Sequence, residues 1–177
     1  MKYFLILLTA ILISSCTALN NSEFEEIYSG YEQIIPQSCK VIVSSLESGN
    51  VEETCSEFKE DDFFVVSLEE NQSCFNVSFL YTFENEVSFK YLGFKNIPVT
   101  NKYFRVETAE IVYDDFEFIR DFLEFDDINT PQYFEIEQDG KLLKFYFAKL
   151  YEPENFAISE SSLNCSFEEL VFYGEQK

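Results

Sequence analysis

After an apolar leader, the chain continues with apolar side chains at the spacing of amphipathic helices. In 22–35 the apolar residues recur three or four positions apart, a capping-box pattern begins the run and Pro36 closes it. The same spacing predicts a second helix over 39–46, with Gly49 as its stop, and a short third helix over 50–58. We therefore expect two or three N-terminal helices.

After residue 60 the apolar period changes to two, which is typical of strands with one buried face. A slip of the apolar phase within 103–113 predicts a bulge, and helical spacing over 114–125 predicts one further helix. The expected strands cover 63–68, 75–83, 87–91, 103–113, 133–151 (as a hairpin) and 167–173. A sheet therefore follows the helices in the chain.

Two short polar stretches are predicted to be hairpin turns. Residues 84–86 (Glu-Asn-Glu) separate two alternating runs, and 139–140 (Asp-Gly) favours a type I′ turn between two more. Pairing across the second turn would place Glu135 opposite Lys144, an attractive pair. Together these elements predict an α+β domain over 22–177, with two or three N-terminal helices packed on a curved antiparallel sheet of about six or seven strands.

The N-terminal segment is typical of a secretory signal. A single Lys precedes an apolar run over 3–13, which is too short to span a bilayer. The run ends at Ile13-Ser14-Ser15-Cys16, a sequence that resembles the lipobox of bacterial lipoproteins. The resemblance implies a signal peptide over 1–15, a lipid on Cys16 and a short tether over 16–21.

The lipobox also implies a location. Acyl chains on Cys16 would hold the protein to a membrane. By the sorting pattern of enterobacterial lipoproteins, Thr17 implies the outer membrane, with the domain on its periplasmic face. Signal cleavage after Ala18 is the alternative, and it would give a soluble secreted protein.

Carboxylates greatly outnumber cations in this chain. It has 33 Asp and Glu against 12 Lys and Arg, which gives a formal charge of −21. Nucleic acid is therefore excluded as a partner, because phosphate binding needs a basic surface. The 21 Phe and 11 Tyr supply the apolar surface of a core, which argues against disorder.

Four cysteines follow the leader, Cys39, Cys55, Cys74 and Cys165. An even number in an exported chain predicts two disulfides, and the sequence leaves three connectivities open. On the expected helices, Cys39 and Cys55 would both face the core, where a disulfide between them is feasible. No two cysteines have the C-x-x-C spacing, which disfavours a redox role.

No pattern in the sequence predicts catalysis. The chain has no His, the residue most used for acid–base chemistry and for zinc, and its five Gly form no phosphate loop. The acidic pairs lack the spacing of a calcium loop and are interpreted as helix caps and solvated edges. They lie at 52–53, 61–62, 114–115 and 126–127. We therefore expect a protein that is not an enzyme and has no cofactor and no metal.

Residues 48–53 combine a small-residue turn with an acidic cap, and an Asp-Asp pair at 61–62 precedes an apolar strand. This order resembles the start of the ketosteroid isomerase-like cone folds of the nuclear transport factor superfamily, and 139–141 is similar to their closing strands. The resemblance implies a sheet that encloses a pocket for an apolar ligand. No catalytic position of that family is matched.

Aromatic residues alternate along the first predicted hairpin. We interpret this stripe as one face of the core, with a ligand cavity or a protein-contact groove as the alternative; it comprises Phe75, Phe79, Tyr81, Phe83, Phe89 and Tyr91. Leu80, Leu92 and Phe94 fall outside the main apolar phase, and they would form a partner surface if exposed.

The sequence therefore favours a non-catalytic envelope lipoprotein that binds the membrane through acyl chains on Cys16 and acts through contacts with another envelope protein. One alternative is a small apolar ligand binder on a cone-shaped fold. Another is a eukaryotic secreted glycoprotein, because four N-x-S/T sequons are present. They lie at Asn20, Asn71, Asn76 and Asn164.

Overall fold

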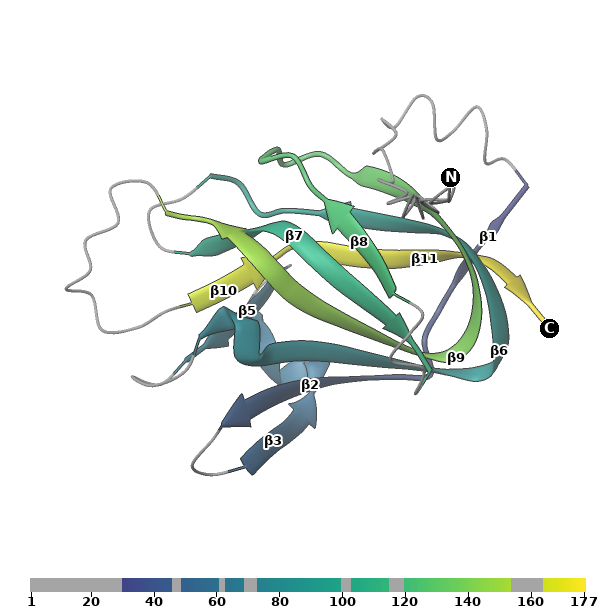
Figure 1. The fold of residues 1–177 in the computed structure, drawn as a ribbon, viewed down its shortest axis with the longest axis horizontal. Helices are drawn as coiled ribbons and strands as arrows, with labels where there is room; N and C mark the ends of the chain where they lie inside the picture. Colours follow the sequence, from purple (N-terminus) through teal and green to yellow (C-terminus); the bar gives the residue numbers. More distant parts are fainter. Residues whose placement is uncertain are drawn as a thin grey trace, which may run out of the picture.

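The structure is a computed structural model that describes residues 30–45, 49–60, 63–68, 73–99, 103–114, 120–153 and 164–177. Within these ranges the chain forms eleven strands of one hydrogen-bonded sheet and two short 3-10 helices (Figure 1). The strands are β1 (Glu32–Ile34), β2 (Ser38–Ser45), β3 (Gly49–Thr54), β4 (Lys59–Glu60), β5 (Phe63–Ser67), β6 (Val77–Lys95), β7 (Phe104–Tyr113), β8 (Arg120–Glu124), β9 (Gln132–Tyr151), β10 (Asn164–Phe167) and β11 (Glu169–Gln176), and the 3-10 helices are η1 (Cys55–Phe58) and η2 (Cys74–Asn76).

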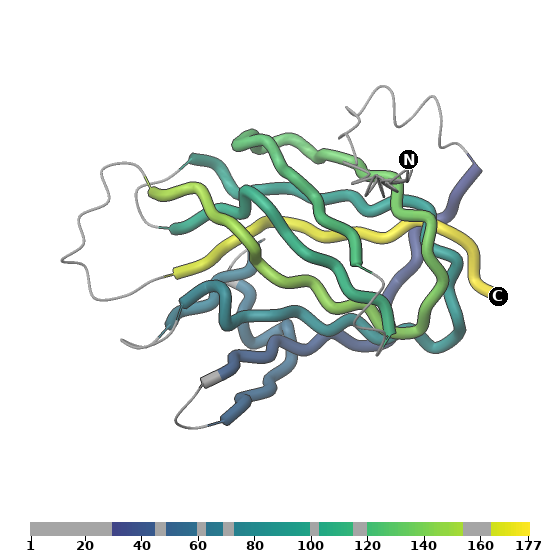
Figure 2. Tube along the Cα trace, in the orientation of Figure 1, coloured from purple at the N-terminus to yellow at the C-terminus, as the bar shows by residue number. Residues whose placement is uncertain are grey.

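Two long antiparallel strands, β6 and β9, organise the sheet. The first half of β6 pairs with the second half of β9, and the second half of β6 pairs with the first half of β9. Both strands bend at the same place, so the sheet curls over on itself (Figure 2). β2 extends the sheet beside the first half of β6 and β11 beside its second half, while β7 follows the second half of β9.

The curled sheet encloses a core dominated by phenylalanine. Aromatic rings from both halves of β6 and β9 meet there, for example Phe94 with Phe145, whose ring centroids lie 5.9 Å apart. Most pairs are edge-to-face or tilted, the arrangements that the ring quadrupole favours. The Phe side chains less than 2% exposed are Phe79, Phe89, Phe94, Phe134, Phe145, Phe167 and Phe172. Alternating burial along both strands therefore supplies the centre of the core, to which the other strands add their own buried side chains.

The expected α+β fold is wrong, because the described N-terminal residues form strands and not helices. Residues 32–34 are β1, 38–45 are β2, and 49–54 are β3, followed by the single 3-10 turn η1. In β2 the Val-Ile-Val run at 41–43 satisfies both a helical and an alternating pattern over so short a segment. β-branched side chains favour the strand, where they pack on a pleated surface. Residues 22–29 of the first expected helix lie outside the described residues.

The helix expected over 114–125 is also wrong in its described part. Residues 120–124 form β8, which pairs antiparallel with β7. Buried Leu123 alternates with more exposed neighbours in β8. The strands expected over 63–68, 103–113 and 167–173 are present, and the register shifts on either side of Thr108 confirm the bulge in β7.

Both predicted hairpin turns are wrong, because each polar stretch marks the bend of a continuous strand. Residues 83–86 of β6 stand opposite one residue of β9, Lys141, between the paired positions 82–142 and 87–140. Bends and turns need the same permissive, polar residues, so local sequence does not separate the two. Glu135 consequently does not face Lys144, and its carboxylate instead accepts a hydrogen bond from Tyr91 Oη at 3.3 Å.

Two disulfides tie the sheet together. Cys39–Cys55 links β2 to η1, and Cys74–Cys165 links η2 to β10 across 91 residues of sequence. Such bonds are typical of proteins that fold in an oxidising compartment. Among the described residues, no helix is long and apolar enough to cross a membrane.

Candidate functional site

A cleft of about 610 Å³ opens on the outer face of the sheet, between η2, β7, β8 and β9. Strand alternation creates it, because Lys144 and Tyr146 of β9 point outward while Phe145 between them is buried in the core. The lining residues are Phe75, Glu110, Val112, Asp114, Arg120, Lys144, Tyr146, Phe147 and Ala148. The cleft is therefore a mixed aromatic and charged surface on a rigid sheet.

The strand register arranges the outward side chains in two rows. In one row Glu110 of β7 stands between Phe122 of β8 and Tyr146 of β9. In the other row Val112 stands between Arg120 and Lys144. Since neighbouring strands are about 4.8 Å apart, the Cα atoms of the two cations in this second row are roughly 10 Å apart.

Phe75 supplies an exposed aromatic ring at the cleft. Its side chain is 57% exposed although the stripe to which it belongs was expected in the core. That expectation is wrong because Phe75 lies in η2, which interrupts the strand alternation before β6 begins. The adjacent Cys74–Cys165 disulfide holds η2, and Asn76 Oδ1 accepts hydrogen bonds from the backbone and hydroxyl of Ser73 at 3.1 and 2.9 Å. The backbone that carries this ring is therefore held beside the cleft.

The carboxylates of the cleft have partners within the protein. Glu110 forms an ion pair with Arg120. Asp114 Oδ1 accepts hydrogen bonds from the backbone N–H groups of Lys141 and Leu142 at 2.7 and 2.8 Å. The backbone of Asp114 has φ of 50°, a left-handed conformation that Asp tolerates better than most residues. Its role is thus to fix the end of β7 against β9, and the interpretation of this acidic residue as a helix cap is wrong.

Behind the cleft, a buried phenol joins β7 to β8. Tyr113, which is 1% exposed, donates a hydrogen bond to Asp121 Oδ2 at 2.8 Å. Burial raises the pKa of the Asp121 carboxyl above its usual range, and the bond from Tyr113 partly opposes this shift. This contact helps to place β8, and with it Arg120, beside the cleft.

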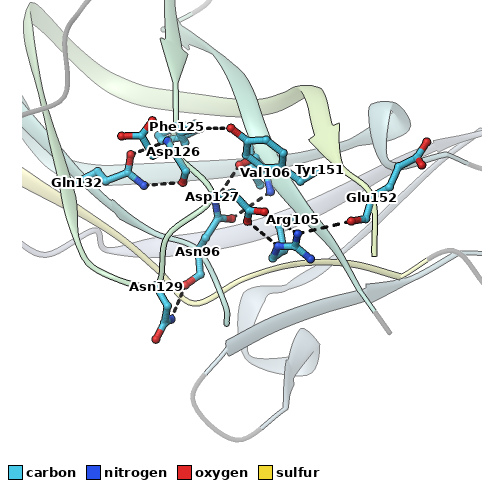
Figure 3. A network of polar contacts seen from close by, with 10 residues as sticks. All are labelled: Asn96, Arg105, Val106, Phe125, Asp126, Asp127, Asn129, Gln132, Tyr151 and Glu152. Atoms are coloured by element: carbon cyan, nitrogen blue, oxygen red, sulfur yellow. Dashed lines mark hydrogen bonds and ion pairs between the residues drawn. The ribbon is translucent and has the colours of Figure 1, made fainter. Parts of the chain in front are cut away.

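A second polar cluster holds the segment between β8 and β9 (Figure 3). Arg105 of β7 is 2% exposed, and its Nε and Nη2 donate to the two carboxylate oxygens of Asp127 at 2.7 Å each. The side chain of Gln132 clamps Asp126, accepting from its N–H and donating to its carbonyl at 2.7 and 3.0 Å. Tyr151 Oη donates to the carbonyl of Phe125 at 2.9 Å.

Asn96 and Asn129 complete this cluster. Fully buried Asn96 exchanges two hydrogen bonds with the backbone of Val106, at 2.8 and 3.0 Å. Asn129 Nδ2 donates to the carbonyl of Asn96 at 2.7 Å. The polar groups of this cluster thus hold the backbone in place. The interpretation of Asp127 as a solvated edge is wrong, because its carboxylate forms an ion pair with the buried guanidinium of Arg105.

The described residues form neither the partner surface nor a metal site of the kinds considered from the sequence. Leu92 and Phe94 are buried, at 0% and 1% exposure, so they do not form a partner surface, and Leu80 is half-buried. Within the part of the chain that the structure describes, no three potential metal ligands come together. Cys16 and the signal peptide lie outside the described residues.

Sequence reasoning missed Arg120 and Lys144 as site residues. Arg120 was placed on a helix, and Lys144 on a hairpin opposite Glu135. One available signal was that Arg120 is the only cation between Asp114 and Asp127, a strongly acidic stretch. Its position beside the cleft depends on pairing between β7 and β8, which local sequence does not reveal.

Comparison with solved structures identifies the fold. A structure of the CBM32-1 and CBM32-2 domains of Clostridium perfringens ZmpB matches with a TM-score of 0.58 and 14% identity, over 91% of this chain and 41% of that one. The chain thus spans about two fifths of that structure. The family 32 CBM of C. perfringens NanJ, solved with galactose, matches with a TM-score of 0.50 and 11% identity over 80% of this chain and 98% of that one.

An F5/8 type C domain from Bacteroides fragilis also matches, with a TM-score of 0.50 and 12% identity over 84% of this chain and 99% of that one. No family model and no curated protein matches the sequence. The chain therefore has the sheet-rich fold of CBM32 and F5/8 type C domains. The resemblance to the ketosteroid isomerase-like cone was wrong, since its low-specificity turn and acidic motifs occur here between strands.

Proposed function

We propose that this chain is a non-catalytic carbohydrate-binding module of an exported lipoprotein. The observation that carries the proposal is the cleft, which combines an exposed aromatic ring with charged side chains on this particular fold. Structures with the same fold are described as complexes with GalNAc and with galactose. A glycan thus takes the place of the envelope protein as the expected partner.

The chemistry of the cleft suits a sugar. A pyranose ring has an apolar C–H face, for which Phe75 and Tyr146 offer aromatic surface, and hydroxyl groups that both donate and accept hydrogen bonds. The Glu110–Arg120 pair supplies a charged acceptor and a charged donor, which form the stronger kind of hydrogen bond. The volume of about 610 Å³ lies within the usual range of about 300–1,000 Å³ for small-molecule sites.

The same contacts disfavour glycoside hydrolysis. Hydrolases of that kind generally need two carboxyl groups that act on the glycosidic bond as acid and as base or nucleophile. Here Glu110 is engaged by Arg120, and Asp114 Oδ1 by two backbone N–H groups. We therefore assign the cleft a binding role.

The anchor in this proposal is a lipid on Cys16, which would hold the module to the periplasmic face of the outer membrane. Two or more acyl chains are sufficient for stable anchoring. An exported Cys16→Ser variant should leave the membrane fraction while it keeps its glycan binding. If that variant stayed in the membrane fraction, the lipid anchor would be contradicted, while the carbohydrate-binding proposal would be unaffected.

A glycan array probed with the full-length exported protein tests the binding role. We expect a defined set of bound glycans, and about a tenfold loss of affinity in Phe75→Ala, because that change removes the exposed phenyl ring of the cleft. Phe122→Ala is the matched control, since Phe122 is 54% exposed on the same sheet face but does not line the cleft. Binding to no glycan, or equal losses in both variants, would refute the proposal.

A further inference from the structure

We propose that the cleft selects sugars that carry an anionic substituent, a carboxylate or a sulfate, through Lys144. This inference rests on the proposed carbohydrate-binding function and names the chemical class of the ligand. The chain has almost three carboxylates for each cation, so a carboxylate partner is expected for most cations.

Most described cations have a carboxylate partner within 4.0 Å. These are Lys40, Lys90, Lys95, Arg105, Arg120, Lys149 and Lys177. Lys59 lies over the ring of Phe64, with its Nζ 5.2 Å from the centroid. Among the cations in the described ranges, Lys141 and Lys144 remain without an ion pair, and of these two only Lys144 lines the cleft.

The surroundings of Lys144 explain why none of the described carboxylates pairs with it. Its cross-strand neighbours are Leu80 on β6 and Val112 on β7, which are both apolar. The nearby carboxylates of Glu110 and Asp114 are already engaged by other groups of the protein. Lys144 is half-buried, and no carboxylate of the described residues lies within 4.0 Å of its ammonium group.

An anionic substituent would supply the missing partner. Tyr146 lies two residues along β9 on the same face as Lys144, and Phe75 lines the same cleft. A sugar ring over the aromatic side chains can therefore direct a carboxylate or sulfate toward Lys144 Nζ. Arg120 lies on the next strand but one, with Val112 between it and Lys144. The total charge of −21 acts against an anion at long range, but salt screens it beyond about 8 Å at physiological ionic strength.

The test compares glycans that differ only in the acidic group. Galactose, galacturonic acid and galactose 6-sulfate, each as a terminal sugar on one common linker, are titrated into the full-length protein by calorimetry, beside an array of neutral and acidic glycans. We expect the acidic forms to bind about 5- to 10-fold more tightly than the neutral form. Comparison of the carboxylate with the sulfate shows which anion the site prefers.

Lys144→Gln should abolish this preference, so that the acidic and neutral sugars bind with equal affinity. Lys141→Gln is the matched control, because it removes the same charge from an unpaired lysine three residues away that does not line the cleft. Equal binding of neutral and acidic sugars, or equal effects of both variants, would overturn the inference while the carbohydrate-binding function stands. Binding to no glycan on the array would refute both.

Discussion

Removing the carboxylate of Asp127 should destabilise the fold strongly, because it takes the paired negative charge away from a buried guanidinium. The Arg105 side chain is 3% exposed and that of Asp127 is 30% exposed. Breaking a fully buried pair by removing one partner costs about 3–5 kcal/mol. Since water reaches part of Asp127, we expect Asp127→Ala to lower the free energy of unfolding by about 2–3 kcal/mol.

Urea unfolding followed by near-UV circular dichroism measures this change, with Asp126→Ala as the control. Asp126 is the adjacent carboxylate, its side chain is exposed, and only its backbone is held by Gln132. We expect the control to cost less than about 0.5 kcal/mol. Adding Arg105→Met to Asp127→Ala should recover part of the loss, because no unpaired charge then stays buried. Equal costs for the two single variants would refute the assignment of Asp127 as the essential partner.

Two further predictions concern stability. Replacing Cys74 and Cys165 by Ala should lower the free energy of unfolding by about 4.6 kcal/mol in the chain-entropy account, since the bond spans 91 residues. Equal stability of the reduced and the oxidised protein would contradict this. Asp121→Asn should raise stability at pH 7 by about 0.5 kcal/mol. Burial raises the folded pKa of Asp121 above its unfolded value of 3.8, so ionisation of this carboxyl costs stability as the pH rises through that range. In unfolding curves the advantage of Asn should therefore vanish at acid pH. An advantage that does not depend on pH would exclude this cause.

Strand content was predictable after residue 60, where one buried face imposes a period of two. The segments 63–68 and 103–113 each have a clear alternation or a short apolar run, and both are strands. Residues 39–46 were not predictable in this way, since the same apolar positions fit a helical face. Their strand pairs with β6, about forty residues away, and such non-local pairing overrides weak local propensity.

The bends of β6 and β9 show a second limit of local sequence. Residues 84–86 and 139–140 have the composition of hairpin turns, but they lie near each other in one corner of the sheet, where the two strands bend together. Interpreting them as turns paired the two halves of each strand with each other, whereas in the structure β6 pairs with β9 along both halves. The cleft was hidden for the same reason, because its rows combine β7, β8 and β9, whose register no short segment encodes.

The most direct test of the account is to locate the bound sugar on the protein. Two-dimensional ¹H–¹⁵N NMR of the full-length chain, titrated with the tightest glycan from the array, should shift amide signals in η2, at 110–114, at Arg120 and at 144–148. Such a pattern would place the ligand on the outer face of the β7–β8–β9 sheet. Shifts confined to residues 125–131, or no shifts with any glycan, would contradict the central claim that this cleft is a carbohydrate-binding site.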